Sequence, residues 1–188
     1  MEPVLPKLVA DACRTLQWLS TQEEAFQRIA AEAVATLRAG GKILTCGNGG
    51  SAADAMHLAE ELVGRFKNNR RSLPSISLNS DTTLLTCIGN DFGFDQVFSR
   101  QIESLANQND LLICFSTSGN SPNILRALEA AKVSRVKSVA LLGKGGGKAK
   151  GLANLEIIVA SNDGGRVQEA HTLILHALLE VIERDVTA

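Results

Sequence analysis

Short apolar runs alternate with amphipathic segments along most of this chain of 188 residues. Five runs are typical of buried strands, at 43–46, 74–78, 111–115, 138–142 and 155–159. Apolar residues spaced by three and four predict helices at 52–63, 97–105, 123–131 and about 165–183. Residues 82–88 fit a helix or a strand, and turn-forming residues predict a loop at 89–93. This alternation predicts a parallel sheet with helices on both faces.

Two more amphipathic helices are predicted before the first strand. Apolar residues recur with helical spacing over residues 4–19, and again from Phe26 to Leu37, where Gly40 and Gly41 follow. A small sheet cannot accommodate both helices, so we expect this pair, residues 1–40, to bury apolar surface against another subunit. Residues 41–188 then form the α/β core of one domain.

Composition narrows the class of partner. Lysine and arginine number 19 against 20 acidic residues, for a net charge of −1, so no basic excess points to nucleic acid or to an anionic membrane. The apolar runs are far shorter than the roughly 20 residues that span a bilayer, and the chain start does not resemble an export signal. We therefore expect a cytoplasmic protein. Its four widely spaced cysteines are expected to be reduced, buried thiols.

A glycine-rich loop follows the first strand and opens the next helix. Its glycines allow close backbone approach, and the first N–H groups of a helix lack intrahelical partners, so the loop suits an anion. The residues expected to contact it are Asn48, Gly49, Gly50 and Ser51. The same loop meets a loose dinucleotide fingerprint, but the acidic residue that such a site needs, Asp81, lies late.

A second loop, rich in hydroxyl groups, follows the strand at 111–115. Its hydroxyl and N–H groups suit a compact phosphate, through Ser116, Thr117, Ser118 and Ser121. Either loop alone would be an ordinary turn, but two such loops at the ends of neighbouring parallel strands face one crevice and together favour a phosphate site. The glycine-rich stretch 143–148 resembles a P-loop only in composition and is interpreted as a flexible surface turn.

Histidines and a glutamate supply the candidate chemistry. His57 and Glu61 are four residues apart and share one face of the helix that follows the glycine-rich loop. They form either a solvated surface pair or two ligands of a zinc ion. The last helix carries His171 and His176, and helical angles do not choose between them because Gln168 lies between their directions.

Four motifs in order identify a family resemblance. CGNGGSAADAMHLAEEL, GNDFGFDQVFSRQ, STSGNSPN and RVQEAH followed by His176 resemble the phosphoheptose isomerases of the sugar isomerase (SIS) domain superfamily. The resemblance implies a flavodoxin-like α/β/α sandwich around a five-stranded parallel sheet, and a homotetramer with active sites at subunit interfaces. It also implies conversion of sedoheptulose 7-phosphate to D-glycero-D-manno-heptose 7-phosphate, the first step of ADP/GDP-heptose biosynthesis.

The resemblance also assigns site residues by motif position. It implies one zinc ion per subunit, held by His57, Glu61, Gln168 and His176, and it selects His176 over His171. Glu61 is expected to act as the base and His176 as the acid in an ene-diol proton transfer. The residues implied to contact the sugar phosphate are Asn48, Gly49, Gly50, Ser51, Glu61, Asn90, Asp91, Ser116, Thr117, Ser118, Ser121 and Gln168.

A related branch supplies the alternative function. The superfamily includes non-catalytic proteins that bind the bacterial replication initiator or sense a sugar phosphate, and the glycine-rich loop resembles theirs as well. The initiator-binding branch lacks the carboxylate at Glu61 and the histidine at His176, and both are present here. The enzyme is therefore the favoured interpretation.

Overall fold

The five apolar runs form one parallel sheet in the computed structural model, which describes residues 3–186. Its strands are β1 (Ile43–Gly47), β2 (Ser75–Ser77), β3 (Leu111–Ser116), β4 (Lys137–Leu142) and β5 (Leu155–Ile158). The strand order is β2-β1-β3-β4-β5, and β1 and β3 pair with Cys46 opposite Cys114. This order is that of flavodoxin-like folds.

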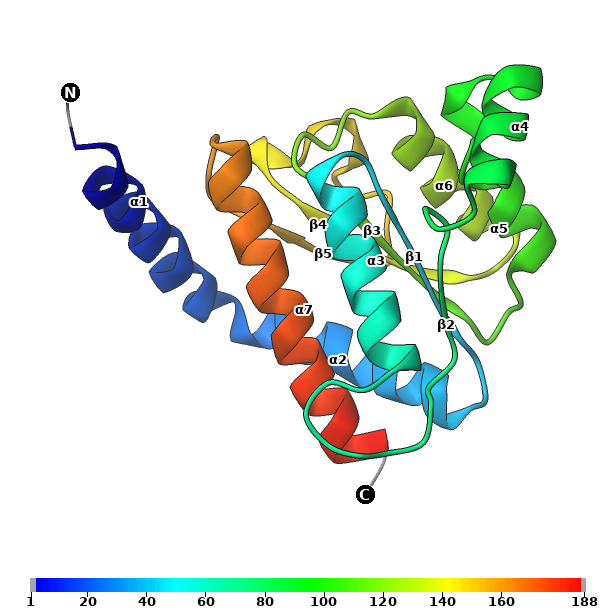
Figure 1. Ribbon diagram of the computed structural model, residues 1–188, viewed down its shortest axis with the longest axis horizontal. Helices are drawn as coiled ribbons and strands as arrows, with labels where there is room; N and C mark the ends of the chain where they lie inside the picture. Colours follow the sequence, from blue (N-terminus) through cyan, green and yellow to red (C-terminus); the bar gives the residue numbers. More distant parts are fainter. Residues whose placement is uncertain (1–2, 187–188) are drawn as a thin grey trace.

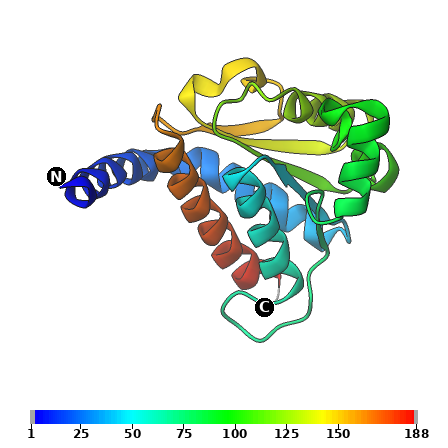
Figure 2. The same ribbon diagram turned by 45° about the horizontal axis from the view of Figure 1, so that its top comes forward.

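Helices cover both faces of the sheet (Figures 1 and 2). One face packs against α2 (Glu23–Arg38), α3 (Gly50–Val63) and α7 (Gly164–Val186), and the other against α4 (Thr82–Phe92), α5 (Ser99–Leu105) and α6 (Pro122–Val133). Successive strand residues point to opposite faces, so Ile113 and Phe115 join the first core and Leu112 and Cys114 the second. The predicted three-layer α/β/α sandwich with a five-stranded parallel sheet is confirmed.

The ambiguous segment 82–88 is helical, and the loop predicted at 89–93 is wrong over most of its length. The Asp81 carboxylate accepts hydrogen bonds from the backbone N–H groups of Thr83 and Leu84, so it caps the helix N-terminus. The helix α4 then runs to Phe92, and Gly93 ends it at a φ of 95°. Asn90 and Asp91 therefore lie on the last turn of a helix. A short 3-10 helix, η2 (Phe94–Gln96), leads into α5.

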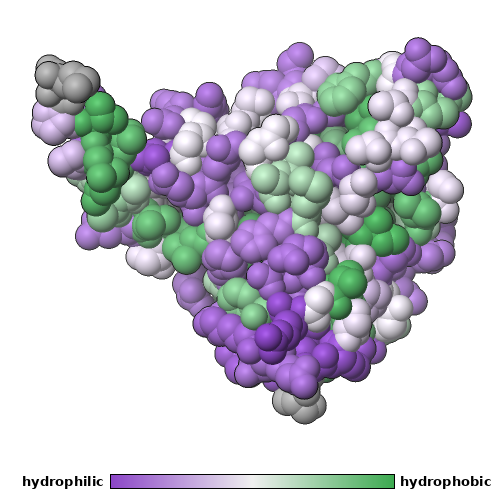
Figure 3. All heavy atoms as spheres, in the orientation of Figure 1, coloured by the Kyte–Doolittle hydropathy of each residue, from purple (hydrophilic) through white to green (hydrophobic). Residues whose placement is uncertain are grey.

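The two N-terminal helices differ in their surroundings. α2 lies on the sheet, while α1 (Val4–Leu19), joined to it by η1 (Ser20–Gln22), projects from the body and contacts α7 (Figure 1). Hydrophobic side chains gather along α1 (Figure 3). Val4, Leu5 and Val9 are each more than half exposed. The apolar face of α1 is thus largely uncovered within residues 3–186.

Two cysteines depart from the expectation that all four are buried. Cys46 and Cys114 are buried on neighbouring strands with their sulfur atoms 3.5 Å apart, whereas Cys13 and Cys87 are exposed. All four are free thiols. Among the helices of residues 3–186, none is both long enough and apolar enough to cross a membrane.

Candidate active site

Both predicted anion loops lie at the carboxyl ends of adjacent strands. β1 and β3 pair directly, yet β2 lies outside β1 and β4 outside β3, so the strand order reverses between them. In open α/β sheets ligands bind outside the carboxyl ends of the strands at such a switch point. The loop after β1, residues 47–50, and the loop after β3, residues 116–121, are therefore placed at the position that the topology favours.

The loop after β1 has a defined backbone shape. A side chain at Gly47 would collide with the Ser51 carbonyl oxygen, at 2.3 Å from the Cβ position, so only glycine permits this turn into α3. The amide of Asn48 exchanges two 2.8 Å hydrogen bonds with the amide of Asn123 at the start of α6. This reciprocal pair links the first loop to the helix that follows the second.

The loop after β3 is stabilised by its own hydroxyl groups. Ser116 Oγ accepts from the Gly119 N–H, and Ser118 Oγ accepts from the Asn120 N–H. Ser121 precedes α6 with a hydroxyl that makes no capping bond, and Pro122 occupies the first turn. Thr117 and Ser118 are half-buried.

The stretch 143–148 lies on the surface, as predicted, with four of its six residues exposed, and it packs against this second loop. It contains the 3-10 helix η3 (Lys144–Ala149), in which Gly146 and Ala149 are buried. A Cβ at Gly119, whose φ is +62°, would lie 1.9 Å from the Gly146 carbonyl oxygen. The Lys148 N–H donates to the Asn120 side chain. The glycine-rich stretch and the hydroxyl-rich loop are thus in close backbone contact.

Asn90 and Asp91 are exposed on the last turn of α4. Their amide and carboxylate hydrogen bond to each other at 2.7 Å, and Asp91 also accepts from the Cys87 thiol. Within residues 3–186 their side-chain hydrogen bonds remain on α4. The structure therefore does not join this predicted pair to either loop by a hydrogen bond.

Three of the four predicted metal ligands lie together where α3 packs on α7. His57 Nε2 is 3.5 Å from Glu61 Oε1, as expected for residues one helical turn apart. The His176 ring meets the His57 ring edge-on, with 5.0 Å between the centroids. His57 and His176 are both half-buried, and the Glu61 side chain is 18% exposed. Residues 119 positions apart in the chain therefore form one cluster.

His57 and Glu61 have the donor atoms and the spacing of two zinc ligands. Imidazole nitrogen and carboxylate oxygen are ordinary zinc ligands, and two ligand atoms each about 2.1 Å from a tetrahedral ion lie about 3.4 Å apart. The 3.5 Å between His57 and Glu61 matches that spacing. The ligand atoms that lie within 4.8 Å of one another belong to His57, Glu61 and the exposed Glu60, and His176 is not part of that group. The side chains of α3 are thus suited to a divalent metal, and His176 contacts them through its ring.

Gln168, the fourth predicted ligand, lies nearer the first anion loop. It precedes His176 by eight residues on α7, a rise of about 12 Å. A Cβ at Gly50 would lie only 2.1 Å from Gln168 Nε2, so the amide rests directly against the first residue of α3. Gln168 therefore connects the glycine-rich loop to the helix that carries His176.

The structure distinguishes the two histidines of α7. His171 is fully buried, with Nε2 3.3 Å from the Leu142 carbonyl oxygen and its ring edge-on to Phe115. Burial lowers the pKa of His171 to about 4, although the bond to the carbonyl opposes this. His171 is thus a neutral core residue beneath β4, and His176 is the histidine that meets His57.

Sequence reasoning missed a hydrogen bond between buried Asp54 and half-buried Thr172 at the same helix junction. Asp54, one turn before His57 on α3, accepts a 2.9 Å hydrogen bond from Thr172, one turn before His176 on α7. Burial raises the pKa of the Asp54 carboxyl, against the lowering effects of Thr172 and His57. Among the described residues its Oδ2 has no hydrogen-bond partner. The sequence did carry a signal for Asp54, because it precedes His57 by three residues and so lies on the same face of the helix.

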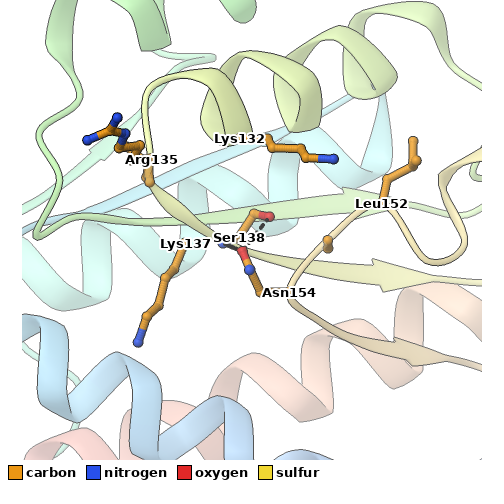
Figure 4. Close-up of a pocket in the computed structure, with 8 residues that line it drawn as sticks. Lys132, Arg135, Lys137, Ser138, Leu152 and Asn154 are labelled. Carbon is orange, nitrogen blue, oxygen red and sulfur yellow. Dashed lines mark hydrogen bonds between the residues drawn. The ribbon is translucent and has the colours of Figure 1, made fainter.

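A different hollow, of about 350 Å³, lies at the opposite edge of the sheet. Figure 4 shows Lys132, Arg135 and Lys137 around it, near Ser138 at the start of β4 and Asn154 before β5. The Arg135 and Lys137 head groups point apart, and Lys137 pairs with Glu32 of α2. This hollow faces the amino ends of the strands, so it lacks the topological advantage of the two loops.

Comparison with known proteins identifies the family independently of the site geometry. The family model described as "SIS domain" matches residues 9–143. A curated phosphoheptose isomerase of Aliarcobacter butzleri is 48% identical over 169 residues, covering 90% of this chain and 89% of that protein. One of Geobacter sp. is 55% identical over 148 residues, covering 79% and 77%.

Solved structures agree. The phosphoheptose isomerase of Francisella tularensis superposes with a TM-score of 0.92 at 34% identity, covering 96% of both chains. That of Neisseria gonorrhoeae gives 0.89 at 38% identity, covering 96% of this chain and 97% of the other. With the switch-point loops and the cluster of His57, Glu61 and His176 in place, these similarities establish that the chain belongs to the phosphoheptose isomerase family of SIS domain proteins.

Proposed function

We propose that this isomerase interconverts sedoheptulose 7-phosphate and D-glycero-D-manno-heptose 7-phosphate, the first step of ADP/GDP-heptose biosynthesis, in the cytoplasm. The observation that supports it most directly is that Glu61 and His176, on two different helices, both lie against His57. A sugar phosphate held by loops 47–50 and 116–121 would present its reacting carbons toward these helices. The family membership of the chain supports the same reaction.

The loops bind and orient the substrate. Backbone N–H groups at the start of α3 and the hydroxyl groups of Thr117, Ser118 and Ser121 suit the phosphate oxygens. Asn48 has its amide paired with Asn123, so its contribution is to fix the loop against α6. Asn90 and Asp91 are exposed on α4, and we propose that they contact the sugar in the assembled oligomer.

Proton transfer is assigned to the cluster. Glu61 takes the proton from C1 of the ketose, and the C1–H electron pair becomes the double bond of an ene-diol as the C2 carbonyl oxygen accepts a proton from His176. The C1 hydroxyl then loses its proton while C2 receives one, which yields the aldose. Each step moves a proton and an electron pair, without any external oxidant or reductant.

The same cluster is proposed to hold one zinc ion per subunit. His57, Glu61 and His176 supply two nitrogens and a carboxylate oxygen, and Gln168 is proposed as the fourth ligand through its amide oxygen. When bound, a zinc ion would supply electrostatic stabilisation of the negative charge that develops on the substrate oxygens. Metal analysis of the purified protein tests this proposal. Stoichiometric zinc that is lost in His57→Ala supports it, and full activity without a bound metal would refute it.

The exposed apolar face of α1 supports a homotetramer. Val4, Leu5 and Val9 are each more than half exposed, and Phe92 and Phe94 are exposed near the predicted substrate residues of α4. Burial of such surface between copies of the chain would stabilise an assembly. Sedimentation at micromolar concentration should give a tetramer, and Leu5→Glu should shift it toward smaller species. A monomeric wild-type protein would contradict the proposal.

The reaction itself is tested by incubating purified protein with sedoheptulose 7-phosphate and measuring formation of the aldose. Glu61→Gln should lower turnover by about 10²–10⁴-fold, the usual contribution of a positioned acid or base. Glu103→Gln, the same substitution at an exposed position of α5 on the other face of the sheet, is the matched control and should retain wild-type turnover. Wild-type turnover by Glu61→Gln would remove Glu61 from the mechanism. Binding of the sugar phosphate without turnover by the wild-type protein would favour a sensing function instead.

A further inference from the structure

The segment between α3 and β2 passes beneath the end of α7. Residues 64–74 leave α3 just after Glu61, loop below the last turns of α7 and return to the sheet (Figure 1). One residue of this segment, Phe66, lies against the His176 ring. The segment therefore touches both helices that carry the proposed acid and base.

The Glu183 carboxylate binds the backbone of this segment. It accepts hydrogen bonds from three consecutive backbone N–H groups, those of Phe66, Lys67 and Asn68, at 3.0–3.2 Å. It also accepts from the Asn68 side chain and from Arg70 Nε. Desolvation raises the pKa of Glu183, but the donated bonds outweigh it, and the pKa lies below its ordinary value. The carboxylate is thus a charged anchor at the end of α7.

The Arg70 guanidinium binds the end of α3. Its Nη2 donates to the carbonyl of Glu61 at 2.6 Å, and its Nη1 donates to the carbonyl of Leu62 at 2.9 Å. These carbonyls belong to the last turn of α3, where acceptors have no further intrahelical donor and a cation is favoured. The side chains of Arg70 and Glu183 are each only 3% exposed. The ion pair is therefore shielded from solvent screening.

Each partner of this ion pair reaches one member of the proposed catalytic pair. Arg70 holds the backbone of Glu61 directly. Glu183 fixes the N–H of Phe66, and the Phe66 ring stacks on His176 with 5.6 Å between centroids and 16° between planes. The bond between Arg70 Nε and Glu183 Oε1, at 3.1 Å, closes the connection.

We propose that Arg70 and Glu183 are positioning residues that set the placement of Glu61 relative to His176 for isomerisation. This inference rests on the proposed function of that pair. Neither residue touches the substrate, so both act through others. A misplacement of about 1 Å can cost about 10²-fold in rate. Loss of the ion pair should therefore lower kcat while the loops that bind phosphate, at the other end of α3, keep KM unchanged.

The test compares buried and exposed ion pairs between the same two elements. Glu183→Gln and Arg70→Gln break the buried pair, and Phe66→Leu removes the stacking while leaving the pair intact. Glu180→Gln breaks the exposed pair of Lys67 with Glu180 and is the matched control. We expect kcat to fall by about 10- to 100-fold in the first three variants with KM within twofold, and to stay at the wild-type value in Glu180→Gln. Losses matched by Glu180→Gln, or explained by a smaller folded fraction, would overturn the inference.

A second readout does not depend on activity. The chain has three histidines, so their ring-proton NMR resonances can be assigned one by one with single substitutions. Stacking on Phe66 shifts the His176 ring-proton resonances. This shift should be smaller in Glu183→Gln than in the wild type, both in the metal-free and in the metal-bound protein. An unmoved His176 resonance in Glu183→Gln would overturn the positioning role. Absence of wild-type turnover would instead contradict the proposed function, while the resonance would still report on the ion pair.

Discussion

The two histidines of α7 stand in opposite environments, so replacing each should have a different effect. His171 is fully buried and neutral beneath β4, and His176 lies in the half-buried cluster with His57. We predict that His171→Leu changes stability and its pH dependence with little effect on turnover. His176→Gln should lower turnover with little effect on stability. The Leu142 carbonyl keeps the Val159 N–H as a donor, so His171→Leu leaves it satisfied.

The size of the pH-dependent contribution of His171 to the free energy of unfolding follows from its pKa. Its value of about 4 in the folded state lies below the ordinary value near 6.5 that the unfolded chain has. The unfolded state therefore binds the proton more tightly, so this group's contribution to stability is complete above pH 6.5 and is lost as the pH falls toward 4. The full loss is about 3 kcal/mol, and about 2 kcal/mol of it falls between pH 7.5 and pH 5.

Urea unfolding of the wild type and both variants at pH 7.5 and pH 5 measures this contribution. Groups other than His171 are shared by the wild type and His171→Leu, so the difference between these two proteins isolates His171. The wild type should lose about 2 kcal/mol more than His171→Leu between the two pH values. An equal loss in these two proteins would refute the reasoning from burial. An active His176→Gln and an inactive, stable His171→Leu would reverse the assignment of the two histidines.

Three further predictions concern the surroundings of the site. Thr172→Val removes the donor to the buried Asp54 carboxylate and should cost about 1–3 kcal/mol in the free energy of unfolding, measured in urea at pH 7.5. Gly119→Ala places a Cβ against the Gly146 carbonyl at a φ of +62°, with about 1–3 kcal/mol of backbone strain, and should raise KM for the sugar phosphate. Unchanged KM would show that this loop does not hold the phosphate. Removal of the metal by a chelator should abolish most turnover, and added zinc should restore it; full activity of the metal-free protein would exclude a metal role.

The sequence predicts the layers of the fold because their signals are local and periodic. Apolar runs such as 111–115 bury completely on strands, and helices with apolar residues every three or four positions cover them. The pairing of His57 with Glu61 is likewise local, because two residues four positions apart on one helix lie side by side whatever the tertiary context. Asp81 carried the missing local signal for the start of α4, since its carboxylate caps the helix N-terminus, whereas no such signal marked its continuation through the turn-forming residues to Phe92.

Other features depend on contacts between distant segments. His171 and His176 differ in role because of how α7 rotates against β4 and α3, which periodicity alone does not determine. Arg70 and Glu183 are 113 residues apart, and nothing local distinguishes them from surface charges. The stretch 143–148 has the composition of a free turn, yet its glycines permit close backbone contact with the loop after β3. Such features require the assembled structure.

The most direct test of the account is isomerisation in heavy water. Purified protein is incubated with sedoheptulose 7-phosphate in D₂O, and NMR follows the formation of D-glycero-D-manno-heptose 7-phosphate. Proton transfer through an ene-diol predicts aldose that carries deuterium at C2 with the wild type, and a rate lowered by about 10²–10⁴-fold with Glu61→Gln. Failure of the wild type to form any aldose, or equal rates for both proteins, would contradict the assignment of an isomerase centre to Glu61 and His176.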